Sequence, residues 1–528
     1  MTGLEPPLTD SRKWWALAVV CTATFMLLVD VTIVIVALPE VQKGLGSSFS
    51  DAQWVLDAYA LSLAAVLLTS GSLADLFGRR RVFLLGLVVF TTGSLACGLS
   101  QSPLMLTLCR AAQGVGGSML FATSLALLAQ NFHGKERGMA FGVWGAVTGV
   151  ASGLGPILGG LLTTGISWRA IFLVNVPVGV AAVALTLWKV TESRLPHAHR
   201  PDWPGFVVFT AGLTSLVYGL IRAGRIGWGD TGVIICLVLA AVFLLGFLAV
   251  EERVAHPMFD LSLLRVPTFN GGLISAFCMN GSLFAMFVYI VLYLQNDLGY
   301  SALGAGLRML LTSMVSLVFS FVAGRLSAHV PVRWLIGPGL VFVGVGILLM
   351  TGIQATSDWT HLAAGLVVAG VGVGLVNPPL ASTAVGVVEP QRSGMAAGIN
   401  TTFRQIGLAV GIAVYGSIFT SSLGRGLRSA LAPTPAMAHA SAHITSLIKQ
   451  GRVNEAFAGL SSAQRGQLVG AIHSSFAGAL NDVLWVGGIL ALVGAVAAAT
   501  LIRSRDFVAS HPEAREEGAV PAAAGAAG

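Results

Sequence analysis

The chain has 528 residues, of which 55% are hydrophobic and only 10% are charged, and its mean hydropathy is +0.82. Soluble domains typically carry about 25% charged residues, so a chain of this composition cannot cover its apolar surface in water. The formal net charge of +7 does not indicate nucleic-acid binding, because no basic stripe lies on a soluble domain. We therefore expect a protein whose surroundings are a lipid bilayer and which has no nucleic-acid partner.

Fourteen hydrophobic segments are long enough to cross a bilayer, which takes about 20 apolar residues in a helix. In chain order they cover 14–38, 53–73, 82–100, 103–130, 138–163, 168–189, 204–222, 231–250, 269–295, 303–324, 332–353, 359–387, 394–421 and 483–503. Backbone groups in hydrocarbon must be hydrogen-bonded within their own segment, so these runs predict helices. The first run is too long for the apolar core of a cleaved signal peptide.

Orientation follows from the Lys and Arg residues of the short connecting segments, which concentrate on the cytoplasmic side of membrane proteins. With a cytoplasmic N-terminus, eighteen of them fall in cytoplasmic segments and four fall outside, namely Lys43, Arg169, Arg222 and Arg225. An even number of spans returns the C-terminus to the cytoplasm. The pattern predicts a multi-pass protein of the cytoplasmic membrane with both termini inside.

Three short motifs of the first half recur in the same order in the second half, displaced by 253 to 256 residues. Gly138-Met-Ala-Phe-Gly recurs from Gly394, Gly114-Val-Gly recurs from Gly370, and the pair Gly71 and Arg80 recurs as Gly324 and Arg333. This order indicates two parallel repeats of six helices, with two inserted helices between them. Parallel repeats about an axis normal to the membrane are typical of transporters whose substrate site lies between the repeats near the midplane.

These observations predict an all-α polytopic membrane protein made of two six-helix bundles plus two inserted helices, acting as a monomer. The expected parts are a cytoplasmic N-terminal segment (1–13), the first bundle (14–189), the inserted helices with their linkers (190–265), the second bundle (266–505) with a long extracellular loop (422–482), and a disordered cytoplasmic tail (506–528).

Several motifs resemble those of one transporter family. Segment 71–81, Gly-Ser-Leu-Ala-Asp-Leu-Phe-Gly-Arg-Arg-Arg, is similar to the signature loop of the major facilitator superfamily. Segment 28–39 resembles the helix 1 motif of its 14-helix drug:proton antiporters, segment 110–117 the helix 4 motif, and segment 145–160 the glycine-proline motif of antiporter helix 5. Segment 168–177 adds to the match. The resemblance, over about residues 12–505, implies the major facilitator fold and export of small amphipathic compounds, such as drugs and antibiotics, in exchange for protons by alternating access.

The signature loop implies a gate at the cytoplasmic end of the second helix. Its residues are Gly71, Asp75, Gly78, Arg79 and Arg80. The resemblance makes Asp75 a gate residue that bonds to the facing helix in one conformation, and the alternative is a solvated loop acid. The second copy of the loop departs from the pattern, with Ala328 where Asp75 would align.

Asp30 is the principal candidate for proton coupling, because an acid in the middle of an apolar helix is expensive to keep and marks a functional site by default. The alternative is a carboxylate held by a partner for structure. Arg110 and Asp30 both lie roughly 10–14 Å from the outer ends of their helices at about 1.5 Å per residue, so they can pair. Asp57, near the outer end of the second helix, is either a second proton or cation site or an interfacial acid.

A series of small residues follows in the fifth helix, consisting of Gly145, Gly149, Gly153, Gly155, Pro156 and Gly159. Small residues four apart let helix backbones approach closely, and a proline bends its helix. The series favours a tight interface between the bundles that prevents a proton leak, and ordinary helix packing is the alternative.

Polar residues within the predicted spans supply candidates for the substrate cavity, namely Gln113, Asn400, Arg404 and Gln405. Arg308 also lies in a span, where it can extend to the interface instead. With Asp30 committed to protons, the buried charge count favours neutral or anionic lipophilic substrates over dications, since like charges repel strongly in low dielectric.

Other functions remain open at this point. Uptake by proton symport uses the same fold, and a transporter-like sensor that moves nothing is a further alternative. A membrane-embedded enzyme is disfavoured because no nucleophile-base set is visible. No GxxxxGK[ST] loop for ATP and no metal-ligand spacing occurs. We therefore expect no cofactor and no metal, with the proton gradient as the energy source and the partners limited to protons, lipid and a small lipophilic substrate.

Overall fold

The computed structural model describes residues 10–47, 49–132, 134–192, 202–254, 257, 259–327, 329–389, 392–432, 457 and 460–507. Within these residues twelve helices are long and apolar enough to cross a membrane. Helix α2, which bends by 51° between Leu67 and Thr69, makes a thirteenth if its two parts form one span, and Arg333–Leu349 is a shorter apolar helix. These helices are consistent with the fourteen spans predicted from the sequence.

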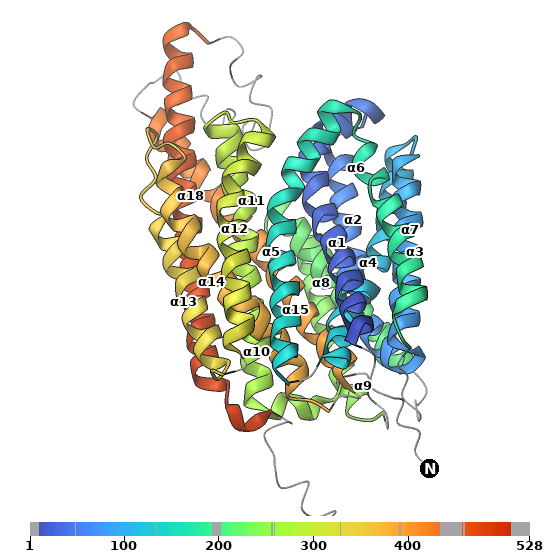
Figure 1. Ribbon diagram of the computed structural model, residues 1–528. Helices are drawn as coiled ribbons and strands as arrows, with labels where there is room; N and C mark the ends of the chain where they lie inside the picture. The colour runs from blue at the N-terminus through green and yellow to red at the C-terminus, as the bar shows by residue number, and fades with distance from the viewer. Residues whose placement is uncertain are drawn as a thin grey trace, which may run out of the picture.

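The first bundle contains six of the membrane-crossing segments, and its helices lie next to one another in Figure 1. Its helices are α1 (Asp10–Leu45), α2 (Phe49–Phe77), α3 (Arg79–Gly98), α4 (Pro103–Asn131), α5 (Gly134–Gly165), the short α6 (Ala170–Leu173) and α7 (Asn175–Lys189). Pro103 starts α4 at a position where its missing N–H costs no hydrogen bond, and the Ser102 side chain caps that helix by accepting from the Met105 N–H.

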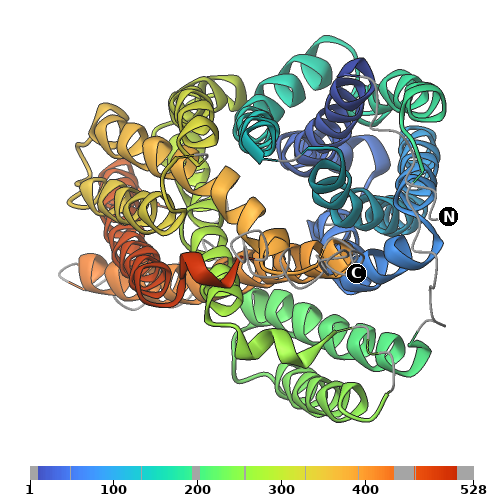
Figure 2. The same cartoon turned by 60° about the horizontal axis from the view of Figure 1, so that its bottom comes forward.

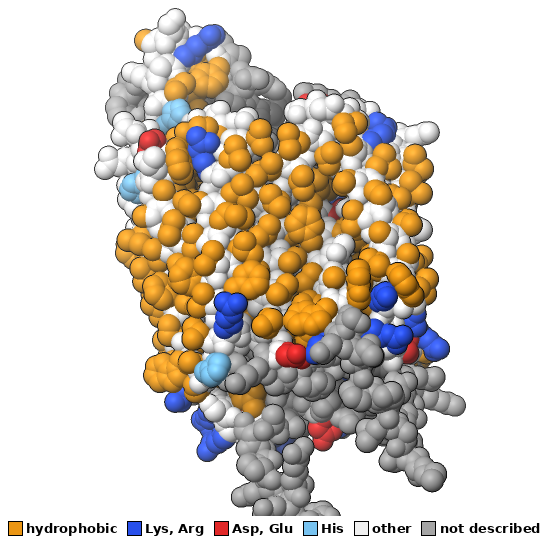
Figure 3. Space-filling view, in the orientation of Figure 1, with side chains coloured by type: hydrophobic (Ala, Val, Ile, Leu, Met, Phe, Trp, Pro, Cys, Tyr) orange, Lys and Arg blue, Asp and Glu red, His pale blue; other side chains and the backbone are white. Residues whose placement is uncertain are grey.

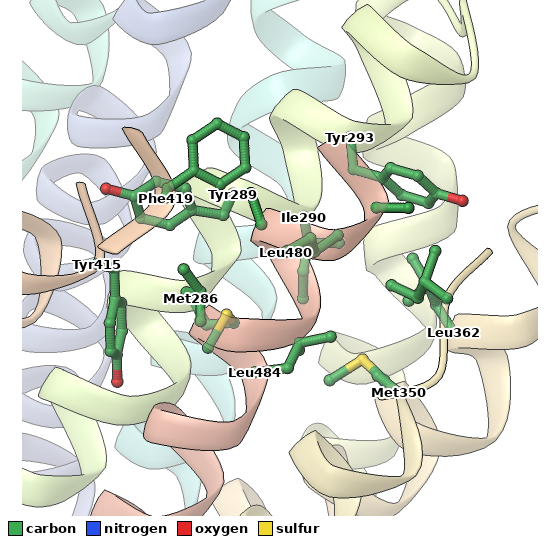
Figure 4. Packing of buried hydrophobic residues seen from close by; sticks show 14 of the residues in the cluster. Met286, Tyr289, Ile290, Tyr293, Met350, Leu362, Tyr415, Phe419, Leu480 and Leu484 are labelled. Atoms are coloured by element: carbon green, nitrogen blue, oxygen red, sulfur yellow. The ribbon is translucent and has the colours of Figure 1, made fainter. Parts of the chain in front are cut away.

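The second bundle repeats this plan. It contains α10 (Pro267–Met279), a π-helical turn η2 (Asn280–Phe284), α11 (Ala285–Leu292), a second π-helical turn η3 (Tyr293–Asp297), α12 (Ala302–Leu326), α13 (Arg333–Leu349), α14 (Thr360–Gly386), α15 (Ser393–Leu431) and α18 (Ser462–Leu501). Aromatic residues pack together in its core: Tyr289 lies beside Tyr415 and Phe419, with Met286 and Leu484 in the same cluster (Figure 4).

The recurring glycines pack in the same way in both bundles. A Cβ at Gly114 would lie 2.5 Å from a backbone oxygen of α2, and one at Gly116 would lie 2.5 Å from a backbone nitrogen of α3. In the second half, Gly370 meets the backbone of α12 at 2.7 Å and Gly372 meets that of α13 at 2.5 Å. The fourth helix of each bundle therefore packs on the second and third helices of its own bundle, as parallel repeats require.

The inserted helices α8 (Trp203–Ile226) and α9 (Thr231–Glu251) lie side by side outside the two bundles (Figure 2). Helix α8 contacts α2 and α15, and the Trp54 ring stacks on Tyr218 with centroids 5.7 Å apart. The pair therefore lies against the junction of the two bundles and belongs to neither. The face seen in Figure 3 is covered by hydrophobic side chains, with Lys and Arg near its ends, as a lipid-facing surface requires.

The start of α1 and the end of α18 lie at the same end of the molecule, which we call the lower face, and the opposite end is the upper face (Figure 1). The start of α3, with Arg79, Arg80 and Arg81, and the start of α13, with Arg333, lie at the lower face as well.

Two segments that the sequence predicted to be a loop and a tail contain helical residues in the structure. The predicted loop 422–482 is helical at both ends, because α15 continues to Leu431 and α18 starts at Ser462, with a capping box formed by Ser461 and Gln464. Leu423, Leu427 and Leu431 recur every four residues and are buried, so an amphipathic stripe rather than hydrophobic length extends α15. Helical structure also reaches into the predicted tail: a short 3-10 helix, Ser504–Asp506, contacts α10 through Asp506 and Thr268. Residues 433–456 and 508–528 lie outside the described part of the chain.

Candidate functional site

Asp30 lies in the middle of α1 and is completely buried. Its Oδ2 accepts a hydrogen bond from Nη1 of Arg110 on α4, which makes the pair a salt bridge. Its Oδ1 accepts from Nε2 of Gln113 and from Nδ2 of Asn175, both at 3.0 Å. The sequence predicted that Asp30 and Arg110 can pair, and the structure brings them into contact.

Arg110 is also enclosed on its other sides. Its Nε donates to the backbone oxygen of Val55 at 3.2 Å, and its Nη1 donates to Oε1 of Gln113 at 2.7 Å. Its guanidinium lies 4.1 Å from the centroid of the Tyr59 ring, close enough for a cation–π contact. A charge this deep in protein is tolerated because it pairs with a carboxylate and because Nε and Nη1 have acceptors.

Five helices of the first bundle supply this cluster: α1, α2, α3, α4 and α7. Ser94 of α3 completes it by accepting from Gln113 at 2.7 Å. Gln113 was predicted to line a substrate cavity, and its side chain lies in the Asp30–Arg110 cluster. Sequence reasoning missed Ser94, Tyr59 and the part played by Asn175. Asn175 is the first residue of the apolar helix α7, and this amide was the one available signal, whereas Ser94 and Tyr59 resemble ordinary core residues.

The predicted gate residues lie at the lower face. Oδ2 of Asp75 accepts a hydrogen bond of 2.9 Å from the backbone N–H of Met395 on α15, and Oδ1 accepts from Nη2 of Arg79 at 3.1 Å. Arg80 donates to the backbone oxygen of Leu187, at 2.7 Å, which attaches the loop to the end of α7. Asp75 therefore joins the two bundles directly.

Two glycines support the geometry of this loop. Gly78 caps α3 with a positive φ of 106°, a conformation that side chains other than glycine rarely adopt. Gly71 is buried within α2. These positions fit the gate predicted from the signature loop without testing its function.

The glycines of α5 divide between two faces. Gly145 meets Pro378 of α14, where a Cβ would lie 2.9 Å from the proline ring. Gly149 and Gly153 meet Ser316 and Ser313 of α12, with Ser313 Cβ at 2.9 Å from a Cβ at Gly153. Gly155 instead meets Thr32 of α1 within its own bundle. Three members of the series thus lie where the first bundle contacts the second, and Gly159 is buried on the same helix.

A second buried guanidinium lies in the second bundle. Arg404 of α15 is 8% exposed, and it donates from Nε to Oδ1 of Asn400 at 3.1 Å and from Nη1 to Oδ1 of Asn377 at 2.9 Å. Both asparagines are fully buried. Asn377, on α14, was not predicted; its signal was an amide in the middle of a span, directly before two prolines.

The remaining candidates are more peripheral. Gln405 is half-buried on α15. Arg308 lies 3.5 Å from the centroid of the Tyr300 ring and donates to the Gly304 carbonyl, so it is stabilised at the upper end of α12. The side chains of Asp57 and Pro156 lie outside the described part of the structure.

Both the sequence and the fold of this chain are similar to those of known proteins. The family model described as Major Facilitator Superfamily matches residues 20–412. The chain belongs to the major facilitator superfamily and is a membrane transporter rather than an enzyme. The human organic anion transporter MFSD10 (TETRAN) has a similar fold, with a TM-score of 0.59 at 16% identity, over 92% of this chain and 100% of that one.

Several curated relatives are substantially similar in sequence. The multidrug resistance protein Stp of Mycobacterium tuberculosis is 36% identical over 80% of this chain and 79% of its own length. The probable actinorhodin transporter of Streptomyces coelicolor is 35% identical over 80% of this chain and 75% of its own length. The tetracenomycin C resistance and export protein of Streptomyces glaucescens is 32% identical over 92% of this chain and 91% of its own length.

Proposed function

We propose that this chain is a proton-coupled antiporter, acting as a monomer, that exports small amphipathic compounds such as drugs and antibiotics across the cytoplasmic membrane. The names of its relatives, which are resistance and export proteins, support this substrate class. The observation that carries the proposal is the completely buried Asp30 and its contact with Arg110. A carboxylate at this depth carries a large desolvation cost, so an acid kept there marks a functional site by default.

Asp30 carries the proton in this account. When its carboxylate is ionised, it accepts hydrogen bonds from Arg110, Gln113 and Asn175. Protonation removes the negative charge and one acceptor, so the attraction to the guanidinium weakens. Because the surrounding donors come from several helices, the change in charge alters the packing of the whole first bundle. Protonation of Asp30 is thereby coupled to the position of the first bundle.

Alternating access then occurs at the contacts between bundles. At the lower face, Asp75 of α2 binds the N–H of Met395 on α15, and a Cβ at Gly138 of α5 would lie 2.5 Å from the Gly324 oxygen of α12. These contacts hold the lower ends together. The distribution of Lys and Arg in the sequence favours a cytoplasmic position for that face, so in this proposal the described conformation is closed toward the cytoplasm.

Transport by purified protein in liposomes tests the proposal. The probes are ethidium, 1-naphthoate and methyl 1-naphthoate, which are cationic, anionic and neutral aromatic molecules. Antiport predicts that at least one probe accumulates against its gradient in vesicles with an acidic lumen, and that a protonophore abolishes this accumulation. Accumulation driven only by the opposite pH gradient would indicate symport, and no gradient-dependent flux of any probe would contradict a transport function.

A further inference from the structure

Three buried donors, one on the guanidinium of Arg404 and two on the asparagines bonded to it, have no acceptor among the described residues. They are Nη2 of Arg404, Nδ2 of Asn377 and Nδ2 of Asn400. Arg404 is 8% exposed and both asparagines are 0% exposed, so the three donors are removed from bulk solvent. A buried donor without an acceptor is costly, and native structures hold few of them.

The orientation of both amides follows from their hydrogen bonds. Each asparagine oxygen accepts from the guanidinium, one from Nη1 at 2.9 Å and the other from Nε at 3.1 Å. Arginine has donors only, so each amide must present its oxygen to Arg404 and its NH₂ group elsewhere. Rotating either amide would place two donors against each other and would remove no unsatisfied group.

The cluster also holds a positive charge without a counterion. Arg404 pairs with no carboxylate among the described residues, in contrast to Arg110, which pairs with Asp30. An unpaired charge in a low-dielectric interior carries a large desolvation cost, which an anion would remove. One anion would satisfy the buried donors and neutralise the charge at the same time.

The cluster lies close to the contact between bundles. Asn377 precedes Pro378, and Pro378 is the residue that faces Gly145 of α5 in the first bundle. A movement of α5 relative to α14 therefore alters the surroundings of the cluster. A ligand bound at this point would be exposed and enclosed by the same motion that changes access.

We propose that Arg404, Asn377 and Asn400 form a binding site for one anionic group, the carboxylate or phenolate of a transported molecule. A carboxylate accepts a charge-assisted hydrogen bond from Nη2 of Arg404 and uses its remaining lone pairs for the two amide NH₂ groups. This inference deepens the proposed function and rests on it, because it names the substrate class that the exporter recognises. A small inorganic anion such as chloride shares the required charge, and the experiment separates the two sources.

Equilibrium binding to the purified protein in detergent tests the site without involving proton coupling. The matched probes are 1-naphthoate and its neutral methyl ester, and chloride is compared with gluconate in the buffer. Wild-type protein binds the acid more tightly than the ester. Asn377→Asp places a carboxylate oxygen where the unpartnered Nδ2 lies, so it satisfies Arg404 internally. It weakens acid binding by about tenfold or more and leaves ester binding unchanged.

Arg404→Gln removes the charge and gives the same loss of acid preference. Arg308→Gln is the matched control, because Arg308 lies in a span but is stabilised by Tyr300, and it preserves the preference. Melting temperatures show that each variant is folded, and Asn377→Asp provides a folded test if Arg404→Gln is unstable.

The outcomes separate the alternatives. Chloride-dependent stabilisation that Asn377→Asp abolishes, without acid preference, keeps the anion site and contradicts its assignment to substrate. Equal binding of acid and ester together with no chloride effect overturns the site. Acid binding that depends on Arg404 in a protein that fails the liposome test keeps the site and removes the export function.

Discussion

The two bundles bury one arginine each in opposite surroundings. Arg110 in the first bundle pairs with Asp30 and lies over Tyr59. Arg404 in the second bundle contacts two asparagine oxygens and no carboxylate of the described chain. The repeat that relates the bundles does not relate these arginines, since the residue 256 positions after Arg110 is Leu366, in an apolar core.

The two bundles therefore share their helix packing but differ in their buried charges. The glycines that join neighbouring helices recur in both halves, because backbone contacts tolerate no side chain. In our proposal the Asp30 carboxylate can exchange its positively charged partner, Arg110, for a proton. The Arg404 guanidinium has only neutral partners among the described residues, so it can bind an anion from outside. In our proposal the first bundle therefore carries the proton, and the second recognises the substrate.

The largest expected effect comes from Asp30→Asn, which removes the titratable group and retains its shape. Uphill transport in liposomes should fall to the level of empty vesicles, because no proton is exchanged. Asp482→Asn changes a half-exposed carboxylate on α18 and serves as the control. The melting temperature of each variant shows whether it is folded. Uphill transport by a folded Asp30→Asn protein would place the proton site elsewhere.

The next largest effect is expected at the contact between α5 and α12. Gly153→Leu forces a side chain against Ser313 and Leu310, whose nearest carbon atoms lie 2.9 and 3.3 Å from the position of its Cβ. Transport should be lost or the vesicles should leak protons, as measured with a lumenal pH dye. Gly165→Leu on the same helix is the control, because no atom of the described residues lies within 4 Å of a Cβ at that position.

The smaller substitution Gly153→Ala allows a rescue experiment with a second substitution at Ser313. Ser313→Gly removes the atoms that the new methyl group meets, so the double variant should transport better than Gly153→Ala alone. Equal activity of the single and double variants would show that this contact does not limit transport.

A moderate effect is expected from Asp75→Asn. The neutral amide has one acceptor oxygen for the two donors of Met395 and Arg79, and a hydrogen bond to a charged group, worth about 1.5–3 kcal/mol, is weakened. The population closed at the lower face should fall by about tenfold, as measured by spin-label distances between the lower ends of α2 and α15. Met395→Ala keeps the backbone donor and should leave those distances unchanged. An unchanged distance distribution in Asp75→Asn would argue against the gate.

The smallest effect is expected from the exposed pair of Asp260 and Arg392, whose arginine side chain is 54% exposed. Burial raises the pKa of Asp260. Hydrogen bonds from Ser262 and the Arg392 guanidinium lower it by more, so the pKa of Asp260 is below its usual value. A lowered pKa stabilises the folded protein above about pH 4 and loses that effect as the pH falls through the folded-state pKa.

Asp260→Asn should therefore cost less than about 1 kcal/mol at neutral pH. The melting temperatures of wild type and variant should converge in acid. A difference that grows as the pH falls would show that the sign of this effect is wrong.

Much of the architecture could be predicted from the sequence, because hydrophobic length and recurring glycines report directly on helices and their packing. The extension of α15 was missed, since Leu423, Leu427 and Leu431 form a stripe that hydropathy averaged along the chain does not detect. Asp30 and Arg110 were found because charge in an apolar run is conspicuous. Asn377 was missed because a single neutral amide gains its meaning from a residue 27 positions away.

Our central proposal is that the first bundle carries the proton and the second recognises the substrate. It is tested most directly by measuring ligand binding and proton release together, in weakly buffered detergent solution. The account predicts that wild-type protein releases protons as it binds either naphthoate probe, because ligand and proton compete in an antiporter. Asp30→Asn should lose proton release and keep the preference for acid over ester. Asn377→Asp should lose the preference and keep proton release with the ester. If either variant loses both properties while remaining folded, the two sites form one coupled unit and the account is contradicted.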